Sequence, residues 1–528
     1  MDSNVAELLS RAASQEPDKT VLSEAATGRT ITCSSLDDLV QRVVQGLSDA
    51  GMVAGYRVMI ATGNSIEFVA TYLGALRAGM VVVPVNPRSA TGELIRMLAD
   101  SGTRMVIADP TTIATVRAAA GGLGEAMEAA GYEPAARPRI VTVGTTLAPG
   151  ERGWDQLIAT RGRPLPSRVD PESLAVLLYT SGTSGRPRAA MLSHRALLAN
   201  VEQVAQVQPQ MITGRDVVLG VLPLFHVYGL NAVLGQVLRQ QARLVLVDGF
   251  DPEGSLDLIE DEAISVLPVA PPVFAYWMQV PGLEERLGPV RLVLSGSAPL
   301  DPHLTAAFTA RTHVQVHEGY GLTEAAPVVT STLCSKELRP RSVGAALPGI
   351  EIRLVDDNGR EPRDEDGGEI HIRGANLFSG YWPDGADGPD EDGWWPTGDV
   401  GYLDPSGDLY LVDRIKELVI VSGFNVYPVE VEDVIGELDG VAEAAVIGVP
   451  DELTGEAVVA YVQPTSADAR DDLEAFVRRH CEERLARFKQ PSVIHVVDRL
   501  PYTPTGKVQK GRLRATERRR ALGLLESM

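Results

Sequence analysis

Cysteine is scarce in this sequence, with three residues among 528, at Cys33, Cys334 and Cys481. They stand too far apart to offer the close spacing of a metal site or the paired pattern of a disulfide framework. Thiols that are neither bridged nor bound to metal are typical of a reducing compartment. We therefore expect a cytoplasmic protein whose fold is not held by disulfides.

Basic residues are few relative to acidic ones, with 48 lysines and arginines against 70 aspartates and glutamates and a net charge of −22. A chain of this charge lacks the basic surface that general nucleic-acid binding needs, so we exclude nucleic acid as a partner. The run RLRATERRR, from Arg512 to Arg520, is the dense basic exception. A solvated helix face and a phosphate-docking face both fit that run.

Long apolar runs are also missing. The longest ones are broken by charges or prolines, as in LGALRAGMVVVPVN at 73–86, so we expect no membrane span. The N-terminal stretch MDSNVAELLSRAASQEPDK carries acids early and lacks the apolar core of a signal peptide. Peripheral contact with a membrane stays open.

Short β-branched runs alternate with helix-like segments through much of the chain. VMIAT at 58–62 precedes SIEFVATYLGALRAG, and VVVPVN at 81–86 precedes TGELIRMLADSG. The rhythm continues in MVIAD and returns in VVLGVLPL, ARLVLVDG, SVLPVAPP, VRLVLSGSAPL and VQVHEGYG. Strands that alternate with helices favour crossover units and a mainly parallel sheet. We predict an α/β fold with two doubly wound layers in a chain of roughly two to four domains.

The pattern changes from about Val343, where short strands with turn signals dominate, as in GIEIRLVDDNG, GGEIHIRG and GDLYLVDR. The triplets DNG and SGD favour hairpin turns, so we predict a small antiparallel or β-barrel-like unit at about 343–413. Beyond it, VEVEDVIGEL, AAVIGVPD, AVVAYVQP and DLEAFVRRHCEERL indicate a compact α+β unit. We therefore predict an N-terminal core at 1–413 and a C-terminal domain at 414–528.

The stretch YTSGTSGRPR, at 179–188, places hydroxyls, glycines and arginines directly after the apolar run LAVLL. Such a cluster is typical of an exposed loop. It also fits an anion site, because glycines let backbone N–H groups converge while hydroxyls and arginines add donors and charge. The loop by itself leaves both interpretations open.

Five further motifs follow this loop in order along the chain: LPLFHVYGL at 222–230, HEGYGLTE at 317–324, WPTGD at 395–399, DRIKELVIVSGFNVYP at 413–428 and PTGKVQK at 504–510. Together with the loop, they give the chain a resemblance over nearly its whole length to the adenylate-forming superfamily. The motifs around LFHVYGL and GYGLTEAAPVVT resemble the fatty acyl-CoA synthetase branch. The resemblance implies that ATP and a carboxylic acid form an acyl-adenylate, whose acyl group passes to CoA, with ATP, Mg²⁺ and CoA as cofactors.

The resemblance also implies an ATP site. Its loop residues hold phosphates, the segment HEGYG lies along adenine, and Asp399 and Arg414 hold the ribose. The residues carried over are Thr180, Ser181, Gly182, Thr183, Ser184, Gly185, Arg188, Glu318, Gly319, Tyr320, Gly321, Asp399 and Arg414. Two departures stand out, since Arg188 and Ala189 occupy positions where the family commonly has lysine and glycine. The positive charge is kept, but a planar guanidinium is not a point charge.

The resemblance implies catalytic roles for four residues. Thr323 touches the α-phosphate, Glu324 binds Mg²⁺ and Lys507 bridges the carboxylate and the α-phosphate, while His226 orients the acid at the mouth of its pocket. The implied acyl-binding residues are His226, Tyr228, Gly229, Gly296, Ser297 and Ala298, with Ser297 in place of a usual glycine. Gly423 and Phe424 belong to the implied CoA path, and Lys416 is the implied hinge of a mobile C-terminal lid.

Several alternatives stay open from the sequence. The acid is a medium- or long-chain fatty acid by the resemblance, but aryl, terpenoid and polyketide acids remain alternatives. The thiol is CoA or an acyl carrier protein, and no long insertion of the kind found in carrier-loading ligases is visible. A non-catalytic nucleotide-binding module and a kinase that releases ADP are rivals from other classes.

Overall fold

We describe the protein from a computed structural model. It describes residues 3–129, 137–160, 169–180, 188–298, 300–356, 359–362, 367–414, 417, 419–421, 424–451, 454–466, 472–485, 487–503 and 506–521. The predicted residues Ser181 to Gly185, Lys416 and Gly423 lie outside this part of the chain. No helix in the described ranges is long and apolar enough to cross a bilayer.

The first parallel sheet has seven strands in the order β7-β6-β5-β3-β4-β8-β9. They are β3 (Arg57–Ala61), β4 (Val81–Pro84), β5 (Met105–Ala108), β6 (Arg139–Thr142), β7 (Arg152–Gly153), β8 (Leu174–Thr180) and β9 (Arg188–Ser193). The accompanying helices are α2 (Cys33–Asp49), α3 (Ile66–Arg77), α4 (Thr91–Ser101), α5 (Ile113–Ala129) and α6 (Trp154–Leu157). Only the β8–β9 pair is antiparallel among the recorded pairings, so the predicted doubly wound layer is confirmed.

The second parallel sheet has seven strands in the order β14-β13-β12-β10-β11-β1-β2. They are β1 (Thr20–Glu24), β2 (Thr30–Thr32), β10 (Val217–Gly220), β11 (Arg243–Leu246), β12 (Val266–Val269), β13 (Leu292–Ser295) and β14 (Val316–Glu318). Its helices are α1 (Glu7–Gln15), α7 (His194–Ala205), α8 (Gln236–Gln240), α9 (Pro252–Asp261), α10 (Pro272–Trp277), α11 (Leu283–Arg286) and α12 (Pro302–Thr312). Each predicted run from VVLG to VQVHE supplies one parallel strand of this sheet.

Helix α3 is buried on every side, since all of its residues from Ile66 to Arg77 are buried. A helix that is apolar around its whole circumference belongs inside a protein. Ser65 starts it, because its hydroxyl accepts a hydrogen bond from the Phe68 N–H at 3.2 Å. The main hydrophobic core contains α3 together with residues of both parallel sheets, so the two layers share one interior.

The antiparallel unit is a six-stranded sheet in the order β15-β16-β20-β19-β18-β17. The strands are β15 (Thr330–Ser331), β16 (Ser342–Ala346), β17 (Ile350–Val355), β18 (Gly368–Gly374), β19 (Trp394–Leu403) and β20 (Asp408–Arg414). The SGD turn joins β19 to β20 as predicted, with Gly407 at φ +88°. The unit begins somewhat before the predicted 343, because β15 pairs with β16 across the short segment between them.

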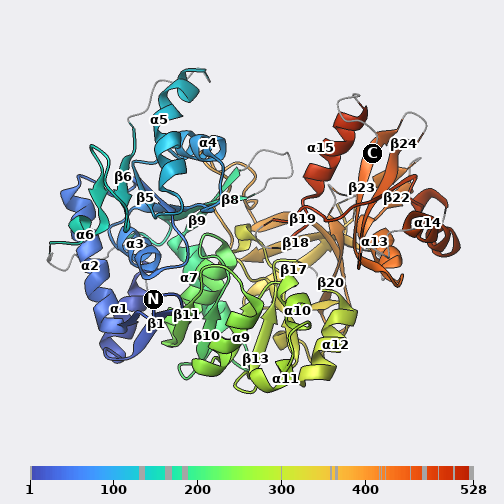
Figure 1. The fold of residues 1–528 in the computed structure, drawn as a ribbon, viewed down its shortest axis with the longest axis horizontal. Coiled ribbons are helices and arrows are strands. Elements are labelled where there is room, and N and C mark those ends of the chain that lie inside the picture. Colours follow the sequence, from blue (N-terminus) through green and yellow to red (C-terminus); the bar gives the residue numbers. More distant parts are fainter. Residues whose placement is uncertain are drawn as a thin grey trace.

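The C-terminal residues form an α+β unit, as predicted, and gather at the right of Figure 1 beside β18–β20. Its main sheet has the order β22-β21-β24-β23, and β25 pairs in parallel with β24. The elements are β21 (Val419–Val421), β22 (Phe424–Val426), α13 (Pro428–Gly436), β23 (Val441–Asp451), β24 (Gly455–Pro464), α14 (Leu473–Arg484), β25 (Val493–Val496) and α15 (Lys510–Ala521). The basic run 512–520 lies on α15.

A buried histidine joins the N-terminal segment to the helix that follows β9. His194 begins α7 and is 1% exposed, and its Nδ1 accepts a hydrogen bond from the Val5 N–H at 3.2 Å. Among the described residues its Nε2 has no hydrogen-bond partner. Burial lowers the pKa of His194 from 6.5 to about 4. The imidazole is therefore neutral in the folded protein at neutral pH.

This pKa predicts acid sensitivity. Between pH 6.5 and about 4 the unfolded chain binds a proton at residue 194 that the folded chain does not, so the free energy of unfolding falls as the pH falls. The shift corresponds to on the order of 3 kcal/mol once the pH reaches the folded pKa. His194→Asn keeps an acceptor for Val5 and removes the titration. Urea unfolding at pH 7 and pH 4.5 should show a smaller acid loss in the variant, by about 2 kcal/mol; equal losses would contradict the assignment.

Candidate active site

The hydroxyl-glycine loop starts and ends at the edge of the first parallel sheet. Thr180 ends β8, Arg188 begins β9, and the two residues pair across the antiparallel ladder. The Thr180 hydroxyl donates to the Arg188 carbonyl at 3.3 Å. The described ends of the loop are therefore fixed next to each other, while Ser181 to Gly185 lie outside the described residues.

Strand β9 runs beside Ser379–Trp382, a segment that is distant in the sequence. The Met191 N–H donates to the Gly380 carbonyl at 3.0 Å, and the Ser379 N–H donates back to the Met191 carbonyl at 2.9 Å. The Trp382 N–H donates to the Ala189 carbonyl at 2.9 Å. These backbone bonds attach a connection within the antiparallel unit to the strand that follows the loop.

Arg188 has two neighbours that come from this connection. Its guanidinium forms an ion pair with Asp387 at 2.7 Å, and its central carbon lies 3.9 Å from the centre of the Tyr381 ring. The Tyr381 hydroxyl donates to Oε1 of Glu324 at 2.6 Å. A chain of contacts therefore joins the exit of the loop to Glu324.

Glu324 lies in a short 3₁₀ turn, Thr323–Ala325, and is 8% exposed. The backbone of the turn is held on both sides, because the Phe378 N–H donates to the Glu324 carbonyl at 2.8 Å and the Asn376 amide donates to the Ala325 carbonyl at 2.7 Å. Phe378 also packs edge-on against Tyr381 with ring centres 5.0 Å apart. Both the carboxylate and its tyrosine partner are thus held in place from the antiparallel unit.

Asp399 and Tyr320 form a second buried pair, each 7% exposed. The Tyr320 hydroxyl donates to Oδ2 of Asp399 at 2.6 Å. Asp399 lies on β19 opposite Arg414 on β20, so the backbone register brings these two predicted ribose residues together. The predicted adenine segment and the predicted ribose carboxylate are therefore joined directly.

The glycines beside Tyr320 allow a close backbone approach. A Cβ on Gly321 would lie 2.3 Å from the Pro327 carbonyl oxygen, and one on Gly319 would lie 2.7 Å from that of Thr330. Either side chain would clash with backbone. Burial raises the pKa of the neighbouring Glu318 carboxyl to about 7.

The predicted acyl residues come from two loops that meet. His226 and Tyr228 follow β10, and Gly296 follows β13; a Cβ on Gly296 would lie 3.0 Å from Cε1 of Tyr228. Gly229 is also crowded, since its Cβ would lie 2.4 Å from the Pro223 carbonyl oxygen. Ser297, which stands at a usual glycine position, has φ +77°, a left-handed conformation that favours glycine. Ala298 follows it and is partly buried.

Lys507 lies at the end of a tight turn in the C-terminal unit. The Thr503 N–H donates to the Lys507 carbonyl at 2.7 Å, and the Lys507 N–H donates to the Thr503 hydroxyl at 3.0 Å. The preceding Gly506 has φ +83°, and a Cβ there would lie 2.7 Å from Cγ of Pro272 on α10. The turn therefore lies directly against the N-terminal core.

The charge of Lys507 affects the pKa of His226. Its pKa is lowered to about 4, first by burial and second by the positive charge of Lys507. The charge of Lys507 therefore acts on His226, although the two residues are far apart in the sequence. At neutral pH the imidazole is neutral.

Some functional neighbours were not found from the sequence. Tyr381, Asp387 and Asn64 stand in no motif that the sequence reasoning used, and nothing in their local patterns distinguishes them. The contact of the Tyr320 hydroxyl with Asp399 was also missed, because it joins positions that only the fold brings together. Phe424 begins β22, and no role follows from its backbone position.

Asn64 holds the segment that leads to His226. Its Oδ1 accepts from the Leu224 N–H at 2.9 Å. Its amide group donates to the carbonyls of Gly220, Leu222 and Val247, at 3.0–3.2 Å. A side chain that follows β3 in the first sheet thus fixes the end of β10 and the loop after it in the second sheet.

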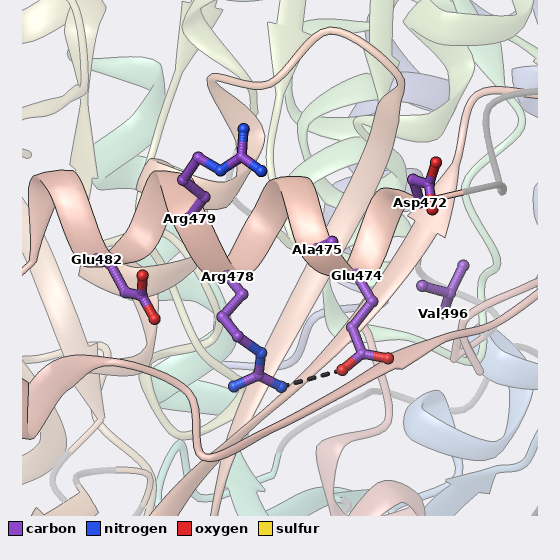
Figure 2. A pocket seen from close by; sticks show the side chains of 7 residues that line it. All are labelled: Asp472, Glu474, Ala475, Arg478, Arg479, Glu482 and Val496. Carbon is purple, nitrogen blue, oxygen red and sulfur yellow. Dashed lines mark hydrogen bonds and ion pairs between the residues drawn. The ribbon is translucent and has the colours of Figure 1, made fainter.

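A hollow on the C-terminal unit lies along α14, and Figure 2 shows its lining. The lining residues are Asp472, Glu474, Ala475, Arg478, Arg479, Glu482 and Val496. Glu474 and Arg478 form an ion pair at 3.0 Å one helical turn apart. None of the predicted site residues lines this hollow, and its charges of both signs are typical of a solvated helix face.

Two family models match the N-terminal and C-terminal parts of the chain. A family model described as AMP-binding enzyme matches residues 9–382, and one described as AMP-binding enzyme C-terminal domain matches residues 430–507. The chain belongs to the AMP-binding enzyme family. It is an ATP-dependent acid–CoA ligase of the adenylate-forming superfamily, and the CoA ligases of this superfamily use ATP, Mg²⁺ and CoA. The boundary at 413/414 stays a prediction.

Three known proteins to which this ligase is similar narrow the comparison within the family. It is 34% identical to 4-coumarate–CoA ligase 5 of Oryza sativa subsp. japonica, over 94% of this chain and 92% of that one. Its fold matches ATP-bound MatB from Rhodopseudomonas palustris with a TM-score of 0.86 and 33% identity, covering 98% and 99% of the two chains. It also matches the anthranilate CoA ligase AuaEII in complex with anthranoyl-AMP, with a TM-score of 0.86 and 25% identity over 99% and 100% of the chains.

Two points follow from these likenesses. Apo MatB gives a TM-score of 0.75, so the ligase resembles the ATP-bound form of that protein more than its apo form. The names of two of these relatives refer to aromatic acids, 4-coumarate and anthranilate. They favour the non-fatty alternative over the predicted fatty acyl substrate.

The contacts of Asn64 predict a cost for its removal. Asn64→Ala leaves three carbonyls and one N–H of the loop without this partner, and we expect the free energy of unfolding to fall by about 2–4 kcal/mol. Asn64→Asp keeps the acceptor for Leu224 but sets a carboxylate oxygen against the three carbonyl oxygens, and should lower the free energy of unfolding at least as much as the alanine variant does. Urea unfolding followed by tryptophan fluorescence measures both; a wild-type value for Asn64→Ala would show that the loop is held by other contacts.

Proposed function

We propose that this ligase activates a carboxylic acid with an aromatic or other non-fatty acyl group as an acyl-adenylate, releases pyrophosphate and passes the acyl group to CoA. The observation that supports the reaction is the turn before Lys507, which lies against α10 of the N-terminal core, together with the effect of the lysine charge on His226. The acid class is supported by the names of the relatives. It is further supported by Tyr228, whose ring lies against a glycine backbone and suits a flat acyl group.

We assign the nucleotide to the region between β9 and the Tyr320–Asp399 pair. Asp399, a carboxylate hydrogen-bonded to the Tyr320 phenol, is of the type that accepts two ribose hydroxyls, and its register partner Arg414 lies at the same edge. Tyr320 offers its ring to the adenine. Ser181 to Gly185, with Thr180 and Arg188 at the ends of their loop, are assigned to the phosphates, where glycines and hydroxyls supply close donors.

Glu324 is the residue that we assign to Mg²⁺. A carboxylate oxygen is a ligand that Mg²⁺ prefers, and in nucleotide sites the ion is typically bound by one or two carboxylates together with substrate phosphates. The single carboxylate of Glu324, with one oxygen bonded to Tyr381, fits that pattern. When bound, the ion neutralises charge on the phosphates. Thr323, which directly precedes Glu324 in the chain, is assigned to the α-phosphate.

Lys507 is the residue that we assign to the first half-reaction. Its ammonium group, whose charge acts on a neutral His226, is placed to stabilise negative charge shared by the acid and the α-phosphate as they react. His226 orients the acid and moves no proton in this scheme. The protein supplies position and charge. The bond that breaks joins the α-phosphorus to the leaving pyrophosphate, and the bond that forms joins the α-phosphorus to an oxygen of the attacking carboxylate.

The second half-reaction rests on residues outside the described part, Lys416 as hinge and Gly423 on the path of the CoA arm. A rotation of the C-terminal unit about that hinge would remove Lys507 and present the second segment to the adenylate. CoA is the favoured thiol, and an acyl carrier protein is the alternative acceptor. A cytoplasmic location stays a prediction.

A carboxylic-acid panel in a pyrophosphate-exchange assay tests the proposal. We expect exchange with aromatic acids such as cinnamates and benzoates, and little with saturated acids of medium or long chain. Preference for saturated acids would restore the fatty acyl alternative. The absence of exchange with every acid would favour a non-catalytic nucleotide-binding module, and release of ADP would favour a kinase.

Removal of the lysine should separate the two half-reactions. For Lys507→Ala we expect acyl-adenylate formation to fall about 100- to 1000-fold, as for the loss of one donor aimed at developing charge. Thioester formation from supplied acyl-adenylate and CoA should stay near the wild-type rate. Lys336→Ala, at an exposed lysine of the N-terminal core, is the matched control. Equal losses in both steps would show that Lys507 has no step-specific role.

A further inference from the structure

We infer that Tyr381 is a positioning residue for the metal-binding carboxylate, and that Arg188 supports it by stacking on its ring. The inference rests on the proposed role of Glu324 and extends it to two residues outside that role. It also gives a physical account of the arginine that stands at a usual lysine position.

The geometry of Tyr381 is specific. Its hydroxyl donates to Oε1 of Glu324 at 2.6 Å, which is short for a hydrogen bond between neutral groups and typical of one to a carboxylate. Glu324 is 8% exposed, so few water molecules compete for that oxygen. One carboxylate oxygen is thereby fixed by the protein, and the other is left to face a cation. Partners of this kind orient a metal ligand, and their loss typically reduces metal affinity 10- to 100-fold.

The backbone of Tyr381 is fixed as well. Its neighbours Gly380 and Trp382 are hydrogen-bonded to β9, and its ring packs edge-on against Phe378. Phe378 in turn donates its N–H to the Glu324 carbonyl. The phenol and the carboxylate are therefore placed by the same short segment, which leaves little freedom in the distance between them.

Arg188 completes the arrangement. Its guanidinium carbon lies 3.9 Å from the centre of the Tyr381 ring, a stacking distance, and Asp387 accepts an ion pair from the other side at 2.7 Å. A planar guanidinium can stack on a ring and bind a carboxylate at its edge at the same time, whereas an ammonium is a compact point charge. A cation over the ring draws electron density from the phenol and strengthens its O–H as a donor.

The test measures Mg²⁺-linked ATP binding and needs no turnover. Isothermal titration calorimetry gives the ATP affinity of each variant with saturating Mg²⁺ and with EDTA, and the ratio of the two affinities reports the metal. For Tyr381→Phe we expect this ratio to fall about 10-fold, with the affinity in EDTA unchanged. Tyr402→Phe, at an exposed tyrosine on β19, is the matched control and should keep the wild-type ratio.

Two variants of Arg188 are measured in the same experiment. Arg188→Met keeps an unbranched stem and removes the charge, and we expect the ratio to fall about 2- to 5-fold, the size of an exposed cation–π contact. Arg188→Lys should lie between Arg188→Met and the wild type. A folded Tyr381→Phe protein with the wild-type ratio would overturn the inference.

Glu324→Gln distinguishes failure of the inference from failure of the proposed metal site. If Glu324→Gln abolishes the Mg²⁺-linked gain and Tyr381→Phe does not change it, Tyr381 has no positioning role while the metal assignment stands. If Glu324→Gln keeps the full gain, the metal assignment itself is wrong and the inference falls with it.

Discussion

The candidate site depends on the backbone pairing between β9 and the segment Ser379–Trp382. β9 belongs to the first parallel sheet, and the segment belongs to a connection of the antiparallel unit. Those three N–H to carbonyl bonds, together with the packing of Phe378, hold Tyr381 over Arg188 and within hydrogen-bond distance of Glu324. A site for a large charged nucleotide needs groups from several layers, and backbone bonds between layers are the least flexible way to align them.

Electrostatics at the acid end follow from burial. A histidine with its pKa lowered to about 4 is neutral where the enzyme operates, so it does not oppose the arrival of Lys507. A protonated imidazole would repel the lysine and would also bind the incoming carboxylate as an ion pair. In the mechanism that we propose, neutrality leaves the carboxylate to Lys507, whose charge leaves the site when the C-terminal unit rotates.

The fold was largely predictable because each strand and helix has its own signal in a short stretch of the sequence. Runs such as VMIAT and VVVPVN, separated by helical segments, gave the parallel strands β3 and β4, and SGD gave the hairpin between β19 and β20. The residues of the site came from the resemblance, and the ATP, acid and CoA chemistry of the family is confirmed, whereas the fatty acyl branch is not favoured. Tyr381 and Asn64 could not be found, since the hydrogen bonds of each side chain join positions that are far apart in the sequence. Ser297 was noted as a departure, but its left-handed φ is visible only in the folded backbone.

Two contacts recorded between the C-terminal unit and the core are individually weak, which suits the rotation that we propose. Arg341 forms an ion pair with Asp433 at 2.7 Å, but both side chains are well exposed, and such pairs contribute about 0–1 kcal/mol. Gly506 touches Pro272 through a backbone with no side chain to interlock. Closer interlocking would stabilise this pose at the expense of the next one, because any free energy gained here must be given back on rotation. The same reasoning fits the position of Lys507, whose backbone is hydrogen-bonded to Thr503 within the C-terminal unit itself.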